Sequence, residues 1–189
     1  MVIPIIIILV IVLILILAFW GTYNSLVKLD ERVNEAWSDI TVQLKRRADL
    51  IPNLVEVVKG YAKHETDAIK AVSEARAKMM GARSVADSAE ADGSLTGALS
   101  RLMAVTESYP ELKADQNFQQ LTTEISDTED KIQAARRFYN AGAKELNTKI
   151  KLFPTNLINN MVGHFKKRDY YDVTADEQEK IQKAPEVKF

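Results

Sequence analysis

The stretch VIPIIIILVIVLILILAFW (residues 2–20) has no charged residue, and from Ile5 to Leu17 it contains only isoleucine, leucine and valine. As an α-helix, these roughly 19 residues would span about 28 Å, close to the ~30 Å hydrocarbon core of a bilayer. A soluble chain of 189 residues could hardly bury such a helix on all sides. The stretch therefore predicts one N-terminal transmembrane helix, which we assign to residues 1–22.

The alternative for such a stretch is a cleaved signal peptide. No lysine or arginine precedes the apolar run, the run is long, and the bulky Phe19 and Trp20 stand where a small-x-small cleavage site would be required. An uncleaved anchor is therefore favoured. Phe19, Trp20 and Tyr23 then fall at the membrane interface, where amphipathic rings are enriched.

Basic residues indicate the orientation of this anchor. Lys28, Arg32 and the group at residues 45–47 all follow the apolar stretch, and no basic residue precedes it. By the positive-inside rule, we expect a single-pass membrane protein with a short N-terminus outside and a cytoplasmic C-terminal domain.

Composition excludes several functional classes. The chain has 25 Lys and Arg against 26 Asp and Glu, so it lacks the basic excess of nucleic-acid-binding proteins and we expect no nucleic-acid partner. It has no cysteine, which excludes disulfides, thiolate metal sites, a thiol nucleophile and a lipidated cysteine anchor.

After the apolar stretch, large apolar residues recur every three or four positions, which is the period of an amphipathic helix. The first series is Leu26, Leu29, Val33, Trp37, Ile40 and Leu44, and a second runs from Val55 to Met79. No linker rich in glycine or proline separates the anchor from the first series, so we expect a near-continuous helix. Pro52 predicts a kink or a short break near Ile51.

The segment from Gly81 to Gly97 is small and polar, which predicts a flexible connection where the chain reverses. A shorter helix is expected over residues 95–106. It should end before Pro110, because the residue that precedes a proline is pushed out of the α region.

Asp115 can cap the next helix, whose apolar residues recur at steps of three and four until about Phe153. A short helix around residues 157–165 should follow Pro154. Thr174 and Glu177 have the spacing of a capping box, which predicts a last small helix to about residue 183.

These patterns predict an all-α protein, in which a single N-terminal transmembrane helix is followed by an elongated up-and-down bundle of about four long helices. We place the bundle at residues 23–165 and a C-terminal tail with a short helix at residues 166–189. The long seams are typical of coiled-coil packing, so we expect self-association through the soluble helices.

His64 and Glu65 are the first place to look for catalysis. A zinc protease requires His-Glu-x-x-His, and position 68 is Ala68 instead of histidine. No hydrolase elbow or phosphate loop is found either. We therefore expect no enzymatic activity, no cofactor and no metal site. The alternative, a metal-dependent or hydrolytic activity around His64 and Glu65, stays open.

Several polar residues lie beside or within the apolar stripes, and two interpretations apply to them. They form a solvated helix face, or they form a paired interhelical network or partner groove, because a buried unpaired charge costs several kcal/mol. The residues in question are Arg47, Asn53, Glu107, Glu129, Arg136, Arg137 and Asn140. A compact basic cluster at Lys166–Arg168 is a candidate for contact with anionic lipid, but Asp169 and Asp172 dilute it and favour a solvated helix end.

The sequence resembles the LemA family of bacterial membrane proteins along nearly its whole length. The longer matching motifs are RADLIPNLV (residues 47–55), ESYPELK (107–113) and ARRFYN (135–140). Shorter ones are YNSLV (23–27), His64-Glu65, Thr128-Glu129, Asn147, Phe153-Pro154 and the terminal PEVKF (185–189).

This resemblance implies an anchored helical bundle in the bacterial cell membrane, with a cytoplasmic domain and no established catalytic residues. It also implies an association with membrane proteases of the HtpX type. With the absence of catalytic groups, it favours a non-enzymatic membrane-anchored scaffold or adaptor linked to membrane protein quality control. The expected partners are the lipid bilayer, other copies of the chain and a membrane protease.

Overall fold

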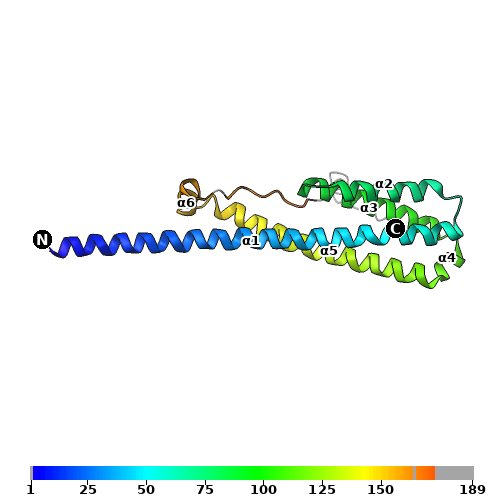
Figure 1. The fold of residues 1–189 in the computed structure, drawn as a ribbon, viewed down its shortest axis with the longest axis horizontal. Helices are drawn as coiled ribbons and strands as arrows, with labels where there is room; N and C mark the ends of the chain where they lie inside the picture. The colour runs from blue at the N-terminus through cyan, green and yellow to red at the C-terminus, as the bar shows by residue number, and fades with distance from the viewer. Residues whose placement is uncertain (1, 164, 173–189) are drawn as a thin grey trace, which may run out of the picture. The chain divides into compact units, whose positions relative to one another are not determined.

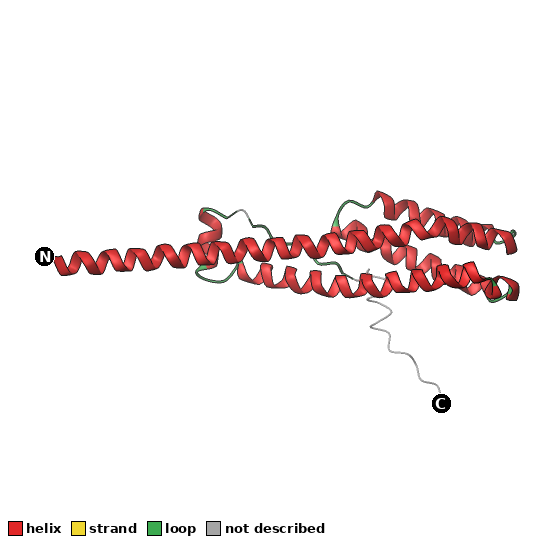
Figure 2. Cartoon of the chain, turned by 60° about the horizontal axis from the view of Figure 1, so that its bottom comes forward, coloured by secondary structure: helices red, strands yellow, loops and turns green. Residues whose placement is uncertain are grey.

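The computed structural model describes residues 2–163 and 165–172, and every regular element in these residues is an α-helix. The elements are α1 (Val2–Tyr61), α2 (Thr66–Gly81), α3 (Val85–Thr106), α4 (Pro110–Ala114), α5 (Gln116–Lys149) and α6 (Thr155–Met161) (Figures 1 and 2). The all-α prediction is confirmed, with α1, α2, α3 and α5 as the long helices.

The apolar stretch forms the N-terminal part of α1. All the large apolar side chains between Ile3 and Leu17 are exposed, as expected for a helix that packs against lipid instead of protein. Within the described residues, α1 is the one helix that is long and apolar enough to cross a membrane. It continues without interruption to Tyr61, which confirms the predicted near-continuous helix.

Of the two possibilities expected near Pro52, the break is wrong, because α1 runs through this residue, and the kink stays a prediction. Proline has no backbone N–H, so the carbonyl oxygen of Ala48, four residues earlier, loses its helical hydrogen bond. Arg76 of α2 supplies the missing donor, with 2.8 Å between its Nε and that oxygen. A tertiary contact thus compensates for the proline inside the helix.

The reversal expected within residues 81–97 is present as a short turn, but the flexible connection expected over the rest of this segment is wrong, because residues 85–97 belong to α3. The chain turns at residues 62–65, between α1 and α2, and again at residues 82–84, before α3. Ser84 and Asp87 form a reciprocal capping box at the start of α3, with 3.0 Å from the Asp87 N–H to Ser84 Oγ. The small residues that suggested a loop are instead buried in α3, where they allow close helix packing: Ser88, Ala89, Ala91 and Asp92.

The predicted cap of α5 is present, since the Phe118 N–H donates to Asp115 Oδ1 at 2.9 Å. α5 ends at Lys149, slightly before the predicted end at Phe153, and turns lead to α6. The predicted helix over residues 174–183 lies outside the described residues. The assignment of residues 23–165 as one bundle stays a prediction.

The chain divides into two compact units. Unit 1 contains α1 up to Trp37, α5 from Phe138, α6 and the segment up to Asp169. In this unit the rings of Trp37 and Tyr139 pack 5.8 Å apart, and a Cβ atom placed on Gly142 would lie 3.2 Å from Val33 Cγ2. The two helices therefore approach closely at Gly142.

Unit 2 contains α1 from Ser38, then α2, α3, α4 and α5 up to Arg137, together with the described residues 170–172. Its core is made of fully buried aliphatic residues from all these helices, among them Ile40, Ile51, Leu54, Leu95, Leu102, Leu112 and Ile132. Unit 2 also contains the polar cluster described next, to which α1, α3 and α5 contribute.

Candidate functional site

A buried ion cluster in unit 2 joins three helices. Arg47 of α1 and Asp92 of α3 are each only 3% exposed, and Arg47 Nη1 lies 2.8 Å from Asp92 Oδ1. The same nitrogen lies 2.6 Å from Glu129 Oε2 of α5. Gln133, one turn further along α5, donates from Nε2 to the other oxygen of Glu129 at 2.7 Å. One guanidinium thus holds two carboxylates from two different helices.

Tyr171 also belongs to this cluster, although it lies in the non-helical segment that follows α6 in the sequence. Its ring is buried, and its hydroxyl lies 3.2 Å from Asp92 Oδ2 and 3.3 Å from the carbonyl oxygen of Ser88. The guanidinium of Arg136 stacks over the Tyr171 ring, 4.9 Å from its centroid, which is a cation–π arrangement. An extended segment is thereby fixed to the helices by aromatic and polar contacts.

Burial dominates the electrostatics of the cluster. It raises the pKa of Asp92 above its usual range, although the nearby Arg47 charge acts in the opposite direction. Burial also raises the pKa of the Tyr171 hydroxyl, and the Asp92 charge adds to this rise. Tyr171 therefore keeps its proton at neutral pH, and its hydroxyl can donate a hydrogen bond to Asp92.

Two members of the cluster, Arg47 and Glu129, belong to the predicted site residues, and Arg136 lies against its Tyr171. Sequence reasoning missed Asp92 and Tyr171. Asp92 was hidden in the segment interpreted as a flexible connection, and Tyr171 in the predicted tail. The spacing of Ser84 and Asp87, with its capping-box potential, is the signal that would have placed Asp92 on a helix.

Three of the other predicted residues lie at the surface and do not belong to this buried cluster. Asn53, Glu107 and Arg137 are exposed, and Glu107 pairs locally with Lys113 at 2.7 Å. Asn140 is half-buried and belongs to unit 1. A structural or binding role for these four residues stays a prediction.

The three residues predicted at the membrane interface all lie on α1 near the end of the apolar stretch. Trp20 is exposed, whereas Phe19 and Tyr23 are half-buried. The Tyr23 ring packs on Phe165 at 6.0 Å between centroids. Tyr23 thus contacts protein as well as the predicted interface.

His64 and Glu65 lie in the turn between α1 and α2. His64 is exposed, and Glu65 accepts a hydrogen bond from the Tyr109 hydroxyl at 3.0 Å. In the part of the chain that the structure describes, no group of three or more His, Asp or Glu side chains is arranged to hold a metal ion. The turn therefore gives no geometric support to metal chemistry at His64.

The buried cluster lies within a recognised family region. The family model described as "LemA family" matches residues 36–189, which includes all members of the cluster and excludes the apolar stretch. The chain belongs to the LemA family. The LemA resemblance seen in the sequence motifs is thus confirmed, and the Arg47 cluster is a feature of the LemA region of this chain.

Similar proteins include Protein LemA of Metamycoplasma hominis, which is 29% identical over 167 residues, covering 86% of this chain and 72% of that protein. Magnetosome protein MamQ 2 of Paramagnetospirillum magneticum is 27% identical over 175 residues, covering 79% of this chain and 64% of that protein. The magnetosome protein MamQ of Magnetospirillum gryphiswaldense is 26% identical with the same coverage. This LemA-family chain thus matches just under two thirds of the length of the MamQ proteins, and none of the three names describes a catalytic activity.

Proposed function

We propose that the protein is a non-enzymatic, single-pass membrane-anchored scaffold or adaptor. The observation that carries this proposal is the continuity of α1, whose apolar stretch passes without a linker into the helix that packs against α5 in unit 1. A helix shared in this way fixes the folded residues to the anchor without a hinge, as a scaffold requires.

The buried cluster supports a structural role. A catalytic group must reach its substrate, but Arg47 and Asp92 are almost completely buried and are paired with each other. Such a network fixes the register of α1, α3 and α5, because a shift of one helix would leave a charge without its partner. The relatives support this proposal too, since MamQ is named for a structure, the magnetosome, instead of a reaction.

We further propose that the folded part is cytoplasmic and that copies of the chain self-associate through their soluble helices. A membrane protease is the proposed partner, with a role in membrane protein quality control. The positive charges after the apolar stretch support this orientation, and the LemA family membership supports the link to membrane proteolysis.

Particle composition tests the scaffold against the adaptor. The full-length protein would be extracted from its native membrane in a lipid-retaining polymer, and the mass and constituents of the particles measured. A large, regular particle made of this chain alone supports a self-assembling scaffold. A small particle with a stoichiometric protease supports an adaptor. A monomer without any partner would contradict both roles.

The orientation can be tested by thiol labelling, because the chain has no cysteine of its own. Lys59→Cys places one thiol on an exposed helix surface of unit 2. In intact cells, a membrane-impermeant maleimide should leave this thiol unmodified and should modify it after lysis. Modification in intact cells would overturn the cytoplasmic placement.

A further inference from the structure

An exposed apolar patch surrounds the turn between α5 and α6. It consists of Leu152, Phe153, Leu157, Met161 and Val162, which are between 46% and 79% exposed, and we call these five residues the α6 patch. Beyond the apolar stretch of α1, the other large exposed apolar residues of the described chain are scattered singly: Val42, Tyr61, Met80, Phe138 and Tyr170. A contiguous patch of this kind marks an interaction surface.

Three contacts within unit 1 hold the α6 patch beside the end of the apolar stretch. Lys149 donates from Nζ to Ser25 Oγ, and the Phe165 ring packs on Tyr23. Asn159 of α6 makes two hydrogen bonds with the Phe165 backbone, of 3.1 and 3.2 Å. α6 is therefore tied to the part of α1 that directly follows Trp20.

This position corresponds to the headgroup region of a bilayer. Tyr23 and Ser25 follow Trp20 by about 4.5 to 7.5 Å along the helix axis, and the headgroup layer on each side of the hydrocarbon core is about 5–7 Å thick. If the apolar stretch spans the hydrocarbon core, the α6 patch lies at the level where amphipathic segments bind.

Charge around the α6 patch complements an anionic lipid surface. Residues 146–168 include five basic residues and no aspartate or glutamate, although the whole chain carries a formal net charge of −1. Three of these cations, Lys151, Lys166 and Lys167, are exposed. Lysines at this level attract anionic headgroups by about 1 kcal/mol each.

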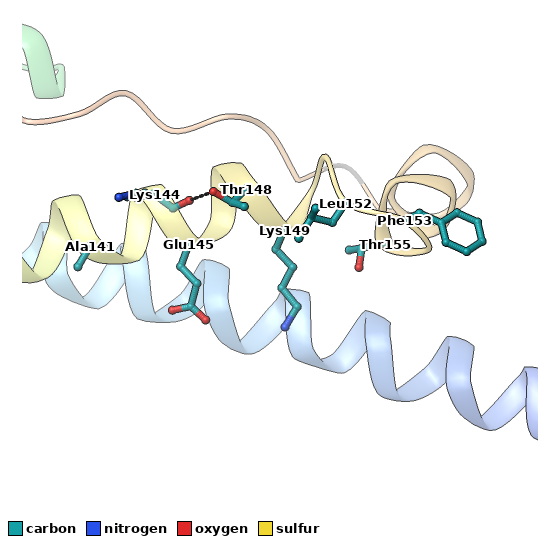
Figure 3. Close-up of a pocket in the computed structure, with 8 residues that line it drawn as sticks. All are labelled: Ala141, Lys144, Glu145, Thr148, Lys149, Leu152, Phe153 and Thr155. Carbon is teal, nitrogen blue, oxygen red and sulfur yellow. Dashed lines mark hydrogen bonds between the residues drawn. The ribbon is translucent and has the colours of Figure 1, made fainter.

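A groove next to the patch completes the surface. It has a volume of about 550 Å³ and is lined by the end of α5 and the following turn, including Ala141, Lys149, Leu152 and Phe153 (Figure 3). Figure 3 shows Phe153 projecting away from α5, on the side where α1 runs toward its apolar stretch. Such a groove provides apolar surface for a lipid acyl chain.

We propose that the α6 patch is a second membrane contact, which docks in the interface of the bilayer spanned by α1 and selects anionic phospholipids. This inference rests on the proposed anchor. It adds that the α5–α6 corner itself inserts apolar side chains among the lipids while its lysines bind the headgroups. Unit 1 is then fixed to the bilayer at two places instead of one.

Single cysteines carrying a nitroxide spin label test this proposal in the full-length chain. The label would be placed at Met161 in the α6 patch, at Val10 in the apolar stretch, and at Met80, an exposed methionine of unit 2. The chain would be reconstituted in vesicles of phosphatidylcholine with and without phosphatidylglycerol. Collision with oxygen reports lipid exposure, and collision with a nickel chelate reports water exposure.

The expected result is a label at Val10 in lipid, a label at Met80 in water, and a label at Met161 in lipid when phosphatidylglycerol is present. Replacing Lys151, Lys166 and Lys167 by glutamine should shift the equilibrium of the Met161 label between lipid and water toward water, by roughly fivefold per lysine.

A Met161 label in water in both vesicles, with Val10 in lipid, would overturn the docking and leave the anchor intact. A Val10 label in water would overturn both. Spin–spin broadening at Met161, with protection from both collision partners, would identify a second copy of the chain as the occupant instead of lipid.

Discussion

Arg47 carries a buried positive charge, and the free-energy cost of removing this charge from water must be compensated by its contacts. Its Nη1 contacts Asp92 and Glu129, while its Nε has no hydrogen-bond partner within the described residues. A buried ion pair of this kind adds little net stability compared with an apolar core. The loss of one partner, however, leaves the other charge buried without compensation, which is strongly destabilising. The cluster is therefore more important for specifying register than for stability itself.

Removal of the shared cation should destabilise unit 2 strongly. We expect Arg47→Met to lower the free energy of unfolding by about 3–5 kcal/mol, because two carboxylates lose their common partner. The measurement is urea unfolding of the full-length chain in detergent micelles, followed by circular dichroism. Arg46→Met, at the exposed neighbouring position, is the matched control and should change stability by less than about 0.5 kcal/mol. Equal effects of the two substitutions would contradict a structural role for the cluster.

The contact between Arg76 and the Ala48 carbonyl should be coupled to Pro52. Arg76→Met should cost about 1–2 kcal/mol, because it leaves a half-buried carbonyl without a donor. In a Pro52→Ala background the residue at position 52 has its own N–H for this carbonyl, so the same substitution should cost much less. A double-mutant cycle of unfolding free energies measures the coupling. A coupling energy near zero would show that Arg76 does not compensate for the proline.

At the scale of elements, the start of α5 depends on the charge of Asp115. Hydrogen bonds from the Phe118 N–H and the Tyr61 hydroxyl lower the pKa of this carboxyl. A lowered pKa in the folded state means that the carboxylate stabilises the fold above the ordinary aspartate pKa of about 4, and that this contribution is lost as the pH falls through the folded value.

Asp115→Asn keeps a capping side chain but removes the charge. We expect the wild-type chain to have a higher melting temperature than the variant at neutral pH, and the difference to shrink as the pH falls below about 4. Thermal melts at several pH values measure this difference. Asp130→Asn, an exposed carboxylate within the same helix, is the control. A difference that stays constant from neutral to acid pH would contradict the assignment to the Asp115 charge.

Glycines in two helices should respond in opposite directions to added side chains. Gly97 is exposed inside α3 and a Cβ there would meet no atom within 4 Å, so Gly97→Ala should stabilise the chain by about 0.5–1 kcal/mol. Gly142→Leu should destabilise it by about 1–3 kcal/mol, because the side chain would collide with Val33. Unfolding free energies of both variants check these signs. Stabilisation by Gly142→Leu would show that α1 and α5 can separate without cost.

Sequence periodicity predicted the helices whose apolar residues are large, and it failed where packing depends on small ones. α1 and α5 have stripes of leucine and isoleucine, so their existence and the Asp115 cap were predictable. The first turns of α3 bury alanine, serine and Asp92. The amino-acid composition of this segment is similar to that of a loop, so periodicity could not identify the helix. The Arg76 contact that carries α1 through Pro52, and the Asp92–Tyr171 contact, depend on residues distant in the sequence.

At the scale of the whole molecule, α1 and α5 each contribute to both units. Unit 1 has its own polar fixing point, where Arg168 Nη2 contacts Asp30 Oδ1 at 2.8 Å and Asn34 Oδ1 at 3.0 Å. The side chain of Asn147 on α5 holds the same segment, because its Nδ2 donates to the Arg168 carbonyl oxygen and its Oδ1 accepts from the Arg168 N–H, both at 2.8 Å. In each unit, an arginine thus helps to hold the segment after α6 against the helices. In unit 1 this is Arg168, which contacts Asp30 and Asn34, and in unit 2 it is Arg136, which stacks on Tyr171.

Because two helices are common to both units, we expect the folded part to unfold in a single transition. Arg168→Met should lower the free energy of unfolding by about 1–2 kcal/mol, a modest loss because the side chain is about one third exposed. Lys167→Met, its exposed neighbour, is the control. Arg168 and Arg47 share no partner, so the losses of the single variants should add in the double variant. Two separate unfolding transitions, each shifted by only one of the substitutions, would instead show that the shared helices do not couple the two units.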